Sequence, residues 1–141
     1  MVIADTGFFL ALANRKDRYH DVARSAYTEL TEPLVTTWPV MTETCHLLVA
    51  RLGVEAQSKF IRSYVDGAFQ AYTLEPDHGP RILALMKKYA DLPMDLADAS
   101  LVILAESLGH GRILSTDLRD FRSYRWKNRQ PFENKLAMAL R

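Results

Sequence analysis

Short apolar runs alternate along the chain with segments in which apolar residues recur every three or four positions. The runs predict buried strands, and the periodic segments predict amphipathic helices. Strands are expected at residues 2–4, 33–36, 69–74 and 112–115. Helices are expected at residues 8–13, 17–30, 39–52, 54–65, 80–89 and 95–108. This alternation predicts an α/β domain with a mainly parallel central sheet flanked by helices.

Several helix ends are marked by residues with a known preference for such positions. Thr37 is a good helix cap with Pro39 in the turn that follows, and Gly53 is typical of a helix end. Gly109 marks a second helix end in the same way. Since no repeat or low-complexity linker divides the chain, we expect residues 1–141 to form one domain.

Composition places the chain among ordinary globular proteins. Hydrophobic residues make up 48% and charged residues 25% of 141 residues, which excludes intrinsic disorder. The apolar run at 8–13 is far shorter than the ~20 residues of a membrane span, and residues 1–5 lack the basic flank of a signal peptide. The single cysteine, Cys45, fits a reducing compartment. We therefore expect a cytoplasmic protein without membrane association.

Charge is balanced overall but not along the chain. The formal net charge is +1, whereas residues 111–141 contain eight basic and three acidic side chains. The basic ones are Arg112, Arg119, Arg122, Arg125, Lys127, Arg129, Lys135 and Arg141. Such an excess favours a nucleic-acid partner, and a solvated basic tail is the alternative.

Two acidic residues follow predicted strands. Asp5 ends the first strand, and Asp117 lies just beyond the fourth. Ligand sites of parallel α/β sheets form at the carboxyl ends of strands. Because Asp is also a preferred helix cap, a purely structural role for each remains open.

Two further acids interrupt apolar helix faces. Glu43 shares a face with Val40, Leu47 and Ala50. Asp98 shares one with Met94, Leu101, Val102, Ala105 and Leu108. An unpaired buried carboxylate costs several kcal/mol, so it needs a cation, a metal or a raised pKa. A salt bridge for Glu43 and a helix-dipole role for Asp98 are the alternatives, although Asp95 can be the cap of that helix.

Four acids that converge would repel one another, and a divalent cation resolves this repulsion. Mg²⁺ or Mn²⁺ prefers oxygen ligands, activates water and stabilises charge on a phosphoryl group. Hydrolysis of a phosphodiester is therefore the chemistry that the pattern favours.

At these residues the chain resembles PIN-domain nucleases, and most closely the VapC-type ribonuclease toxins of bacterial toxin–antitoxin pairs. The resemblance covers nearly the whole chain. It rests on the segments 3–7, Thr42–Glu43, 96–100, 114–117 and Asp120–Phe121, in this order and spacing.

The resemblance implies a single PIN-like domain with an acidic quartet around Mg²⁺: Asp5, Glu43, Asp98 and Asp117. Asp5 and Asp98 would be the principal metal ligands, while Glu43 would help to bind metal or orient the attacking water. Asp117 would complete the cluster, with Asp120 as an alternative fourth acid and Asp95 as an added acid at the rim. Thr6 and Thr116 match positions that steady these acids. The resemblance leaves open whether one or two metal ions bind.

The same resemblance implies a metal-dependent endoribonuclease that hydrolyses RNA, forms a homodimer and is inhibited by an antitoxin protein. A catalytically silent PIN fold that binds RNA or a protein is the alternative. A phospho-accepting receiver domain fits poorly, because the expected acid pair and late lysine are missing. Cys45–His46 lacks zinc-site spacing, and no G-x-S-x-G elbow or phosphate-binding loop occurs.

Overall fold

The computed structural model describes residues 1–136 and centres on a sheet of five strands in the order β3–β2–β1–β4–β7, in which every neighbouring pair is parallel. The strands are β1 Val2–Ala4, β2 Leu34–Thr37, β3 Phe69–Tyr72, β4 Arg112–Leu114 and β7 Glu133–Asn134. A separate antiparallel pair consists of β5 Arg125–Trp126 and β6 Gln130–Pro131. The mainly parallel α/β architecture predicted from the sequence is confirmed.

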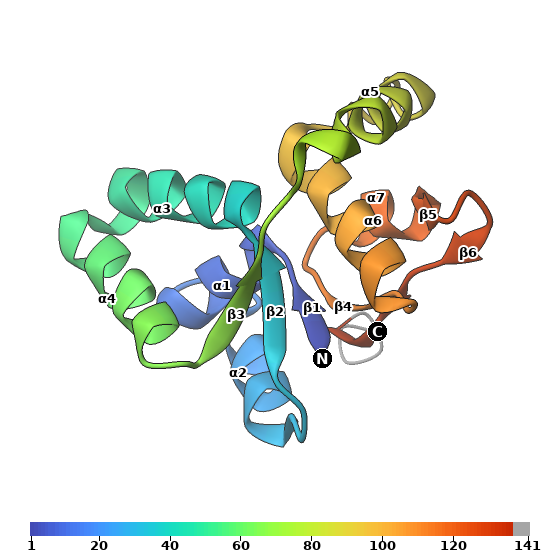
Figure 1. Ribbon diagram of the computed structural model, residues 1–141. Helices are drawn as coiled ribbons and strands as arrows, with labels where there is room; N and C mark the ends of the chain where they lie inside the picture. Colours follow the sequence, from blue (N-terminus) through green and yellow to red (C-terminus); the bar gives the residue numbers. More distant parts are fainter. Residues whose placement is uncertain (137–141) are drawn as a thin grey trace.

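Helices flank this sheet. Figure 1 shows α3 and α4 to the left of the sheet and α6 and α7 to its right. The helices are α1 Thr6–Ala13, α2 His20–Glu29, α3 Trp38–Leu52, α4 Val54–Val65, α5 Gly79–Lys88, α6 Leu96–Leu108 and α7 Leu118–Ser123, with a 3-10 turn at Pro76–His78. No helix within residues 1–136 is long and apolar enough to cross a membrane.

The core lies between the sheet and its helices. All three residues of β1 are buried, and so is every residue of α6 from Ala99 to Ala105. A helix that is apolar on all sides belongs in the interior. Burial of β1 and α6 therefore places Asp5 and Asp98, at the ends of these elements, next to the core.

Capping residues set the helix boundaries much as predicted. The Thr37 hydroxyl accepts a hydrogen bond from the Val40 N–H at 3.3 Å, and Gly53, at φ 97°, ends α3. The helix predicted at 17–30 begins later, at His20, because Asp17 instead forms a turn by accepting a hydrogen bond from the Tyr19 N–H. The short elements α7, β5, β6 and β7 were not predicted.

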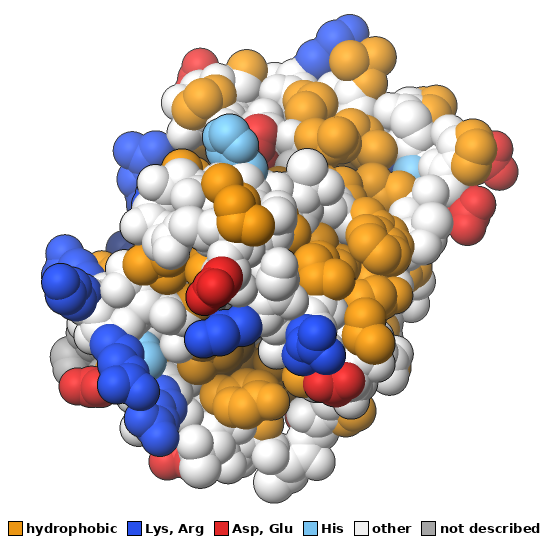
Figure 2. All heavy atoms as spheres, turned by 90° about the vertical axis from the view of Figure 1, so that its left-hand side faces the viewer, with side chains coloured by type: hydrophobic (Ala, Val, Ile, Leu, Met, Phe, Trp, Pro, Cys, Tyr) orange, Lys and Arg blue, Asp and Glu red, His pale blue; other side chains and the backbone are white. Residues whose placement is uncertain are grey.

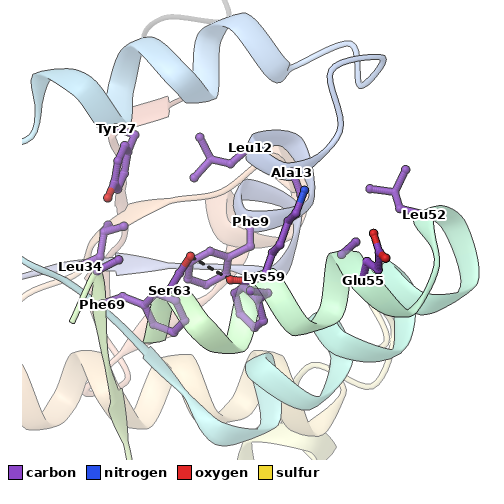
Figure 3. A pocket seen from close by; sticks show the side chains of 13 residues that line it. Phe9, Leu12, Ala13, Tyr27, Leu34, Leu52, Glu55, Lys59, Ser63 and Phe69 are labelled. Carbon is purple, nitrogen blue, oxygen red and sulfur yellow. Dashed lines mark hydrogen bonds between the residues drawn. The ribbon is translucent and has the colours of Figure 1, made fainter. Parts of the chain in front are cut away.

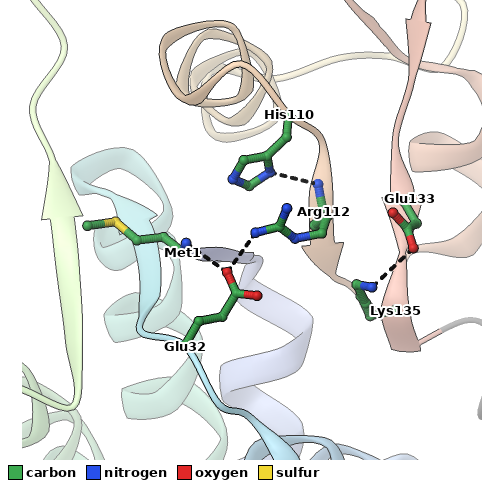
Figure 4. Close-up of polar contacts among 6 residues, drawn as sticks. All are labelled: Met1, Glu32, His110, Arg112, Glu133 and Lys135. Atoms are coloured by element: carbon green, nitrogen blue, oxygen red, sulfur yellow. Dashed lines mark hydrogen bonds and ion pairs between the residues drawn. The ribbon is translucent and has the colours of Figure 1, made fainter.

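The amino ends of the strands carry an ionic cluster, opposite the edge where Asp5 lies. Glu32 Oε1 accepts from Arg112 Nη2 at 2.6 Å and from the amino group of Met1 at 2.8 Å (Figure 4). This contact lowers the pKa of Glu32 to about 2. All three groups are about one-third exposed, so the cluster contributes little to stability.

Candidate active site

The parallel register brings distant parts of the chain to one edge of the sheet. Ala4 of β1 pairs with Leu114 of β4, and the Asp5 N–H donates to the Leu114 carbonyl at 3.2 Å. Asp5 and Ser115 therefore leave their strands side by side. Asp117 follows two residues later, at the start of α7.

Asp5 is the most deeply buried of the predicted acids, with 6% of its surface exposed. Its Oδ1 accepts from the Thr6 N–H at 2.7 Å and so caps α1, while its Oδ2 accepts from the Ser115 hydroxyl at 2.9 Å. Burial raises the pKa of Asp5 from 3.8 to about 7, and Glu43 and Asp117 add to this rise. Asp5 therefore caps α1 and at the same time lies close to other acidic side chains.

Asp98 lies in the first turn of α6. The Asp95 carboxylate caps this helix by accepting from the Asp98 N–H at 2.8 Å. Burial, together with the nearby carboxylates of Asp95 and Asp5, raises the pKa of Asp98 to about 8. Asp98 Oδ2 accepts from the hydroxyl of Tyr124 at 3.0 Å. Burial and the Asp98 charge raise the pKa of Tyr124, so the tyrosine remains a donor.

Glu43 lies on α3 at the margin of the buried face. The prediction that Val40, Glu43, Leu47 and Ala50 form one buried stripe was wrong, since Ala50 is exposed and Leu47 only half-buried. The buried residues of α3 are Val40, Met41, Thr44 and Leu48. Burial raises the pKa of Glu43, and the Asp95 carboxylate contributes to the rise. Glu43 therefore faces other acids and not the core.

The start of α3 is tied to the first turns of α6. The Thr37 hydroxyl shares a 2.6 Å hydrogen bond with the hydroxyl of Ser100, and both side chains are fully buried. This contact fixes the helix that carries Glu43 against the helix that carries Asp98.

Asp117 caps α7 by accepting from the Asp120 N–H at 3.2 Å. Its own N–H donates to the Ser115 hydroxyl at 2.9 Å, so this one hydroxyl contacts both Asp5 and Asp117. Burial and the Asp120 carboxyl raise the pKa of Asp117 to about 6. Asp120 forms an ion pair with Arg119 at 3.4 Å, whereas Asp117 is the acid of the two that raises the pKa of Asp5.

Ion pairs within residues 1–136 leave the predicted quartet without a cation. The pairs involve Glu32, Glu106, Asp120 and Glu133, and none reaches Asp5, Glu43, Asp98 or Asp117. The salt bridge considered for Glu43 is thus absent from the described part of the chain. A buried carboxyl group without a positively charged partner either keeps its proton or binds a cation.

The donor set suits a hard divalent cation. In the described residues, no three Asp, Glu, His or Cys side chains stand together as a ready metal cage. Mg²⁺ is commonly held by one or two carboxylates and several waters, so it needs no such cage. The Thr6 hydroxyl is buried next to Asp5 and meets no hydrogen-bond geometry within residues 1–136, yet it lies near enough to Glu43 to oppose the rise in the pKa of that acid. We conclude that these residues fit Mg²⁺ or Mn²⁺ bound largely through water.

Gly7, in the first turn of α1, allows this helix to pack closely against the segment that carries Asp117. A Cβ atom at position 7 would lie 2.0 Å from the Thr116 Oγ1. Glycine is therefore required here if Thr116, the neighbour of Asp117, is to keep its place.

The basic residues divide into two groups. Arg119 and Arg122 lie on α7, directly after Asp117. Lys127 and Arg129 lie in the turn between β5 and β6, and the Lys127 N–H donates to Glu106, eight residues or ~12 Å along α6 from Asp98. Arg119 lies near enough to Asp117 to oppose the rise in its pKa, whereas Arg141 lies outside the described residues.

A separate apolar cavity of about 570 Å³ opens between α1, α2 and α4 (Figure 3). Phe9, Leu12, Tyr27 and Phe60 are among its lining residues, and none of the candidate acids is. Hydrophobic side chains also gather on the face that carries α3 and α4 (Figure 2), where Val49, Leu52, Val54 and Val65 are exposed. This apolar lining cannot provide the acid chemistry described above.

The fold and the acidic edge resemble those of PIN-type domains, and two comparisons with known proteins support this resemblance. The chain is 27% identical over 124 residues to the ribonuclease VapC26 of Mycobacterium tuberculosis. These aligned residues make up 88% of this chain and 92% of VapC26. Its fold matches the crystal structure of the M. tuberculosis toxin VapC20, described as cleaving the sarcin–ricin loop, with a TM-score of 0.77. The match covers 83% of this chain and 90% of VapC20, at 19% sequence identity. No family model matches. The predicted resemblance to VapC-type PIN ribonucleases is confirmed.

Sequence reasoning found the acids but missed the residues that hold them. Ser115, Ser100 and Tyr124 contact their partners across 110, 63 and 26 residues of sequence. A hydroxyl at a strand end gives no periodic signal. The only indication of a role for Ser115 in the sequence is its position two residues before Asp117.

Proposed function

We propose that the protein is a divalent-metal-dependent endoribonuclease that hydrolyses phosphodiester bonds in RNA and acts as the toxin of a toxin–antitoxin pair. One observation supports the proposal: Glu43 and Asp117 lie near enough to Asp5 to raise its pKa, Asp5 does the same to Asp98, and no Lys or Arg within residues 1–136 forms an ion pair with these acids. The similarity to VapC26 and the VapC20 fold supports the same activity.

Asp5 and Asp98 would hold Mg²⁺ or Mn²⁺, which when bound lowers the pKa of a water and neutralises charge on the phosphoryl group. Glu43 would help to bind the metal or orient the attacking water, and Asp117 would complete the acidic cluster. The Ser115 hydroxyl keeps one oxygen of Asp5 engaged, so the carboxylate has a fixed orientation. Burial raises the pKa of Asp5 and of Asp98, so binding of a cation by these side chains would be accompanied by release of protons.

The substrate brings negative charge to a site that is itself acidic. Arg119 and Arg122 stand on α7 next to Asp117 and offset this repulsion by contacting backbone phosphates. Lys127 and Arg129 lie farther along α6 and would contact a phosphate remote from the scissile bond. RNA longer than a few nucleotides is therefore the expected substrate.

The family resemblance extends the proposal to partners and place. We infer an antitoxin protein that inhibits the enzyme, a homodimer in solution, and a cytoplasmic location, where RNA is available. Size-exclusion chromatography with light scattering tests the dimer directly.

The decisive experiment is RNA cleavage with and without divalent cations. Purified protein should cut mixed RNAs in Mg²⁺ or Mn²⁺ and stop in excess EDTA, and activity should return when the metal is restored. Cleavage that persists in EDTA would refute the metal mechanism. Metal-independent binding without any cleavage would instead favour the silent RNA-binding fold.

A further inference from the structure

Tyr124 is a buried tyrosine whose hydroxyl points at a candidate metal ligand. It ends α7, is fully buried, and donates to Asp98 Oδ2 at 3.0 Å. Within residues 1–136, Tyr124 is the side chain that hydrogen-bonds to the Asp98 carboxylate, and the backbone of Asp95 also contacts this carboxylate. The hydroxyl therefore engages Oδ2 of Asp98 from the side of α7.

The tyrosine ring is held in place from several sides. It packs edge-on against Tyr89, with ring centroids 5.0 Å apart, and against Phe121, at 5.2 Å. Its backbone N–H donates to the Asp120 carbonyl at 2.9 Å. On the far side of the cluster, the Tyr89 hydroxyl accepts from the Arg125 N–H at 3.0 Å. Because the ring cannot move freely, the position of its hydroxyl is fixed.

We propose that Tyr124 is a positioning residue for Asp98. Its hydrogen bond restricts rotation of the carboxylate, so that Asp98 would already hold one orientation when a cation binds. This role rests on the proposed metal-dependent function. Groups that hydrogen-bond to a metal-ligating side chain typically change metal affinity by about 10- to 100-fold when removed.

Tyr124→Phe tests the proposal because it keeps the ring and removes only the donor. We expect the Kd for Mn²⁺ to rise about 10-fold at constant pH, measured on the full chain from the electron paramagnetic resonance signal of free Mn²⁺. RNA cleavage should need correspondingly more Mn²⁺ and recover toward the wild-type rate when the metal is saturating.

Tyr89→Phe is the matched control. It removes a hydroxyl from the same aromatic cluster, but one that contacts Arg125 and no acid. Its Mn²⁺ affinity should equal that of the wild type. Equal affinity in the wild type and Tyr124→Phe would overturn the proposal, and so would an equal loss in both variants, since that would indicate packing alone. A wild type that binds no Mn²⁺ would refute the proposed function and the positioning role together.

A second measurement does not depend on the folding of a variant. In wild-type protein carrying fluorotyrosine, Mg²⁺ should shift the ¹⁹F resonance of Tyr124 and leave that of Tyr89 in place. An unmoved Tyr124 resonance at saturating Mg²⁺ would contradict the contact on which the proposal depends.

Discussion

Asp5→Asn should stabilise the metal-free protein, and the gain should grow with pH. The wild-type carboxylate is buried with 6% of its surface exposed, and the pKa of Asp5 is about 7 in the folded chain against an ordinary 3.8. Asparagine keeps the oxygen that caps α1, because Asn and Asp are equally good caps. The substitution therefore removes the charge while retaining the contact to the Thr6 N–H.

The sign and the size of the change in the free energy of unfolding follow from the pKa of Asp5 in the folded and in the unfolded chain. Since the folded pKa is raised, the folded chain binds the proton more tightly, and wild-type stability is lost as the pH rises from about 4 to about 7. Three pKa units correspond to about 4 kcal/mol, which Asp5→Asn should recover at pH 8. At pH 5 most of the folded wild type is still protonated at Asp5, and the gain should be only about 1 to 2 kcal/mol.

Urea unfolding in EDTA at pH 5 and pH 8, followed by tryptophan fluorescence, measures this difference. Asp91 is exposed, so Asp91→Asn gives the background effect of losing a surface charge. Saturating Mg²⁺ should narrow the gap, because it stabilises only the wild type. A pH-independent gain, or a less stable Asp5→Asn at pH 8, would refute the electrostatic account of the site.

Three further outcomes are expected. Asp98→Asn should lower RNA cleavage by at least about 100-fold while circular dichroism shows an intact fold, and unchanged activity would exclude Asp98 as a ligand. Replacing Arg122, Arg125, Lys127 and Arg129 by alanine should weaken RNA binding and reduce the slope of log K against log salt by about 0.7 per lost phosphate contact, whereas an unchanged slope would show that these residues do not touch RNA. Expression of the wild type should arrest bacterial growth and Asp5→Asn should relieve the arrest, while equal arrest by both would point away from catalysis.

Local signals in the sequence were sufficient for most of the fold. Thr37, Pro39 and Gly53 act through neighbouring backbone groups, so their effect is visible in the sequence itself. In contrast, β7 has two residues and is held by the Asn134 side chain, which donates to the Ser115 carbonyl at 2.9 Å and accepts from its N–H at 3.2 Å. A two-residue strand held by backbone pairing with β4 and by one side-chain amide is too short to leave a periodic pattern.

The candidate site shows the same division. Asp5 and Asp117 were predictable because strand ends of a parallel sheet meet at one edge, and the sequence locates strand ends well. The buried face of α3 was predicted wrongly around Glu43. The spacing of apolar residues shows that a helix has an apolar face, but it does not show where the buried part of that face ends. Tyr124 lies in a segment too short for a periodic signal, and its partner is fixed only by tertiary packing.

The pairing of β1 with β4 has a consequence for biosynthesis. β1 is the central strand, yet its neighbour on one side is made more than a hundred residues later, and Asp117 later still. A nascent chain carries Asp5, Glu43 and Asp98 while the edge that receives Asp117 and the hydroxyl of Ser115 is missing. The acidic edge of the sheet can therefore form only after synthesis has passed β4 and the start of α7.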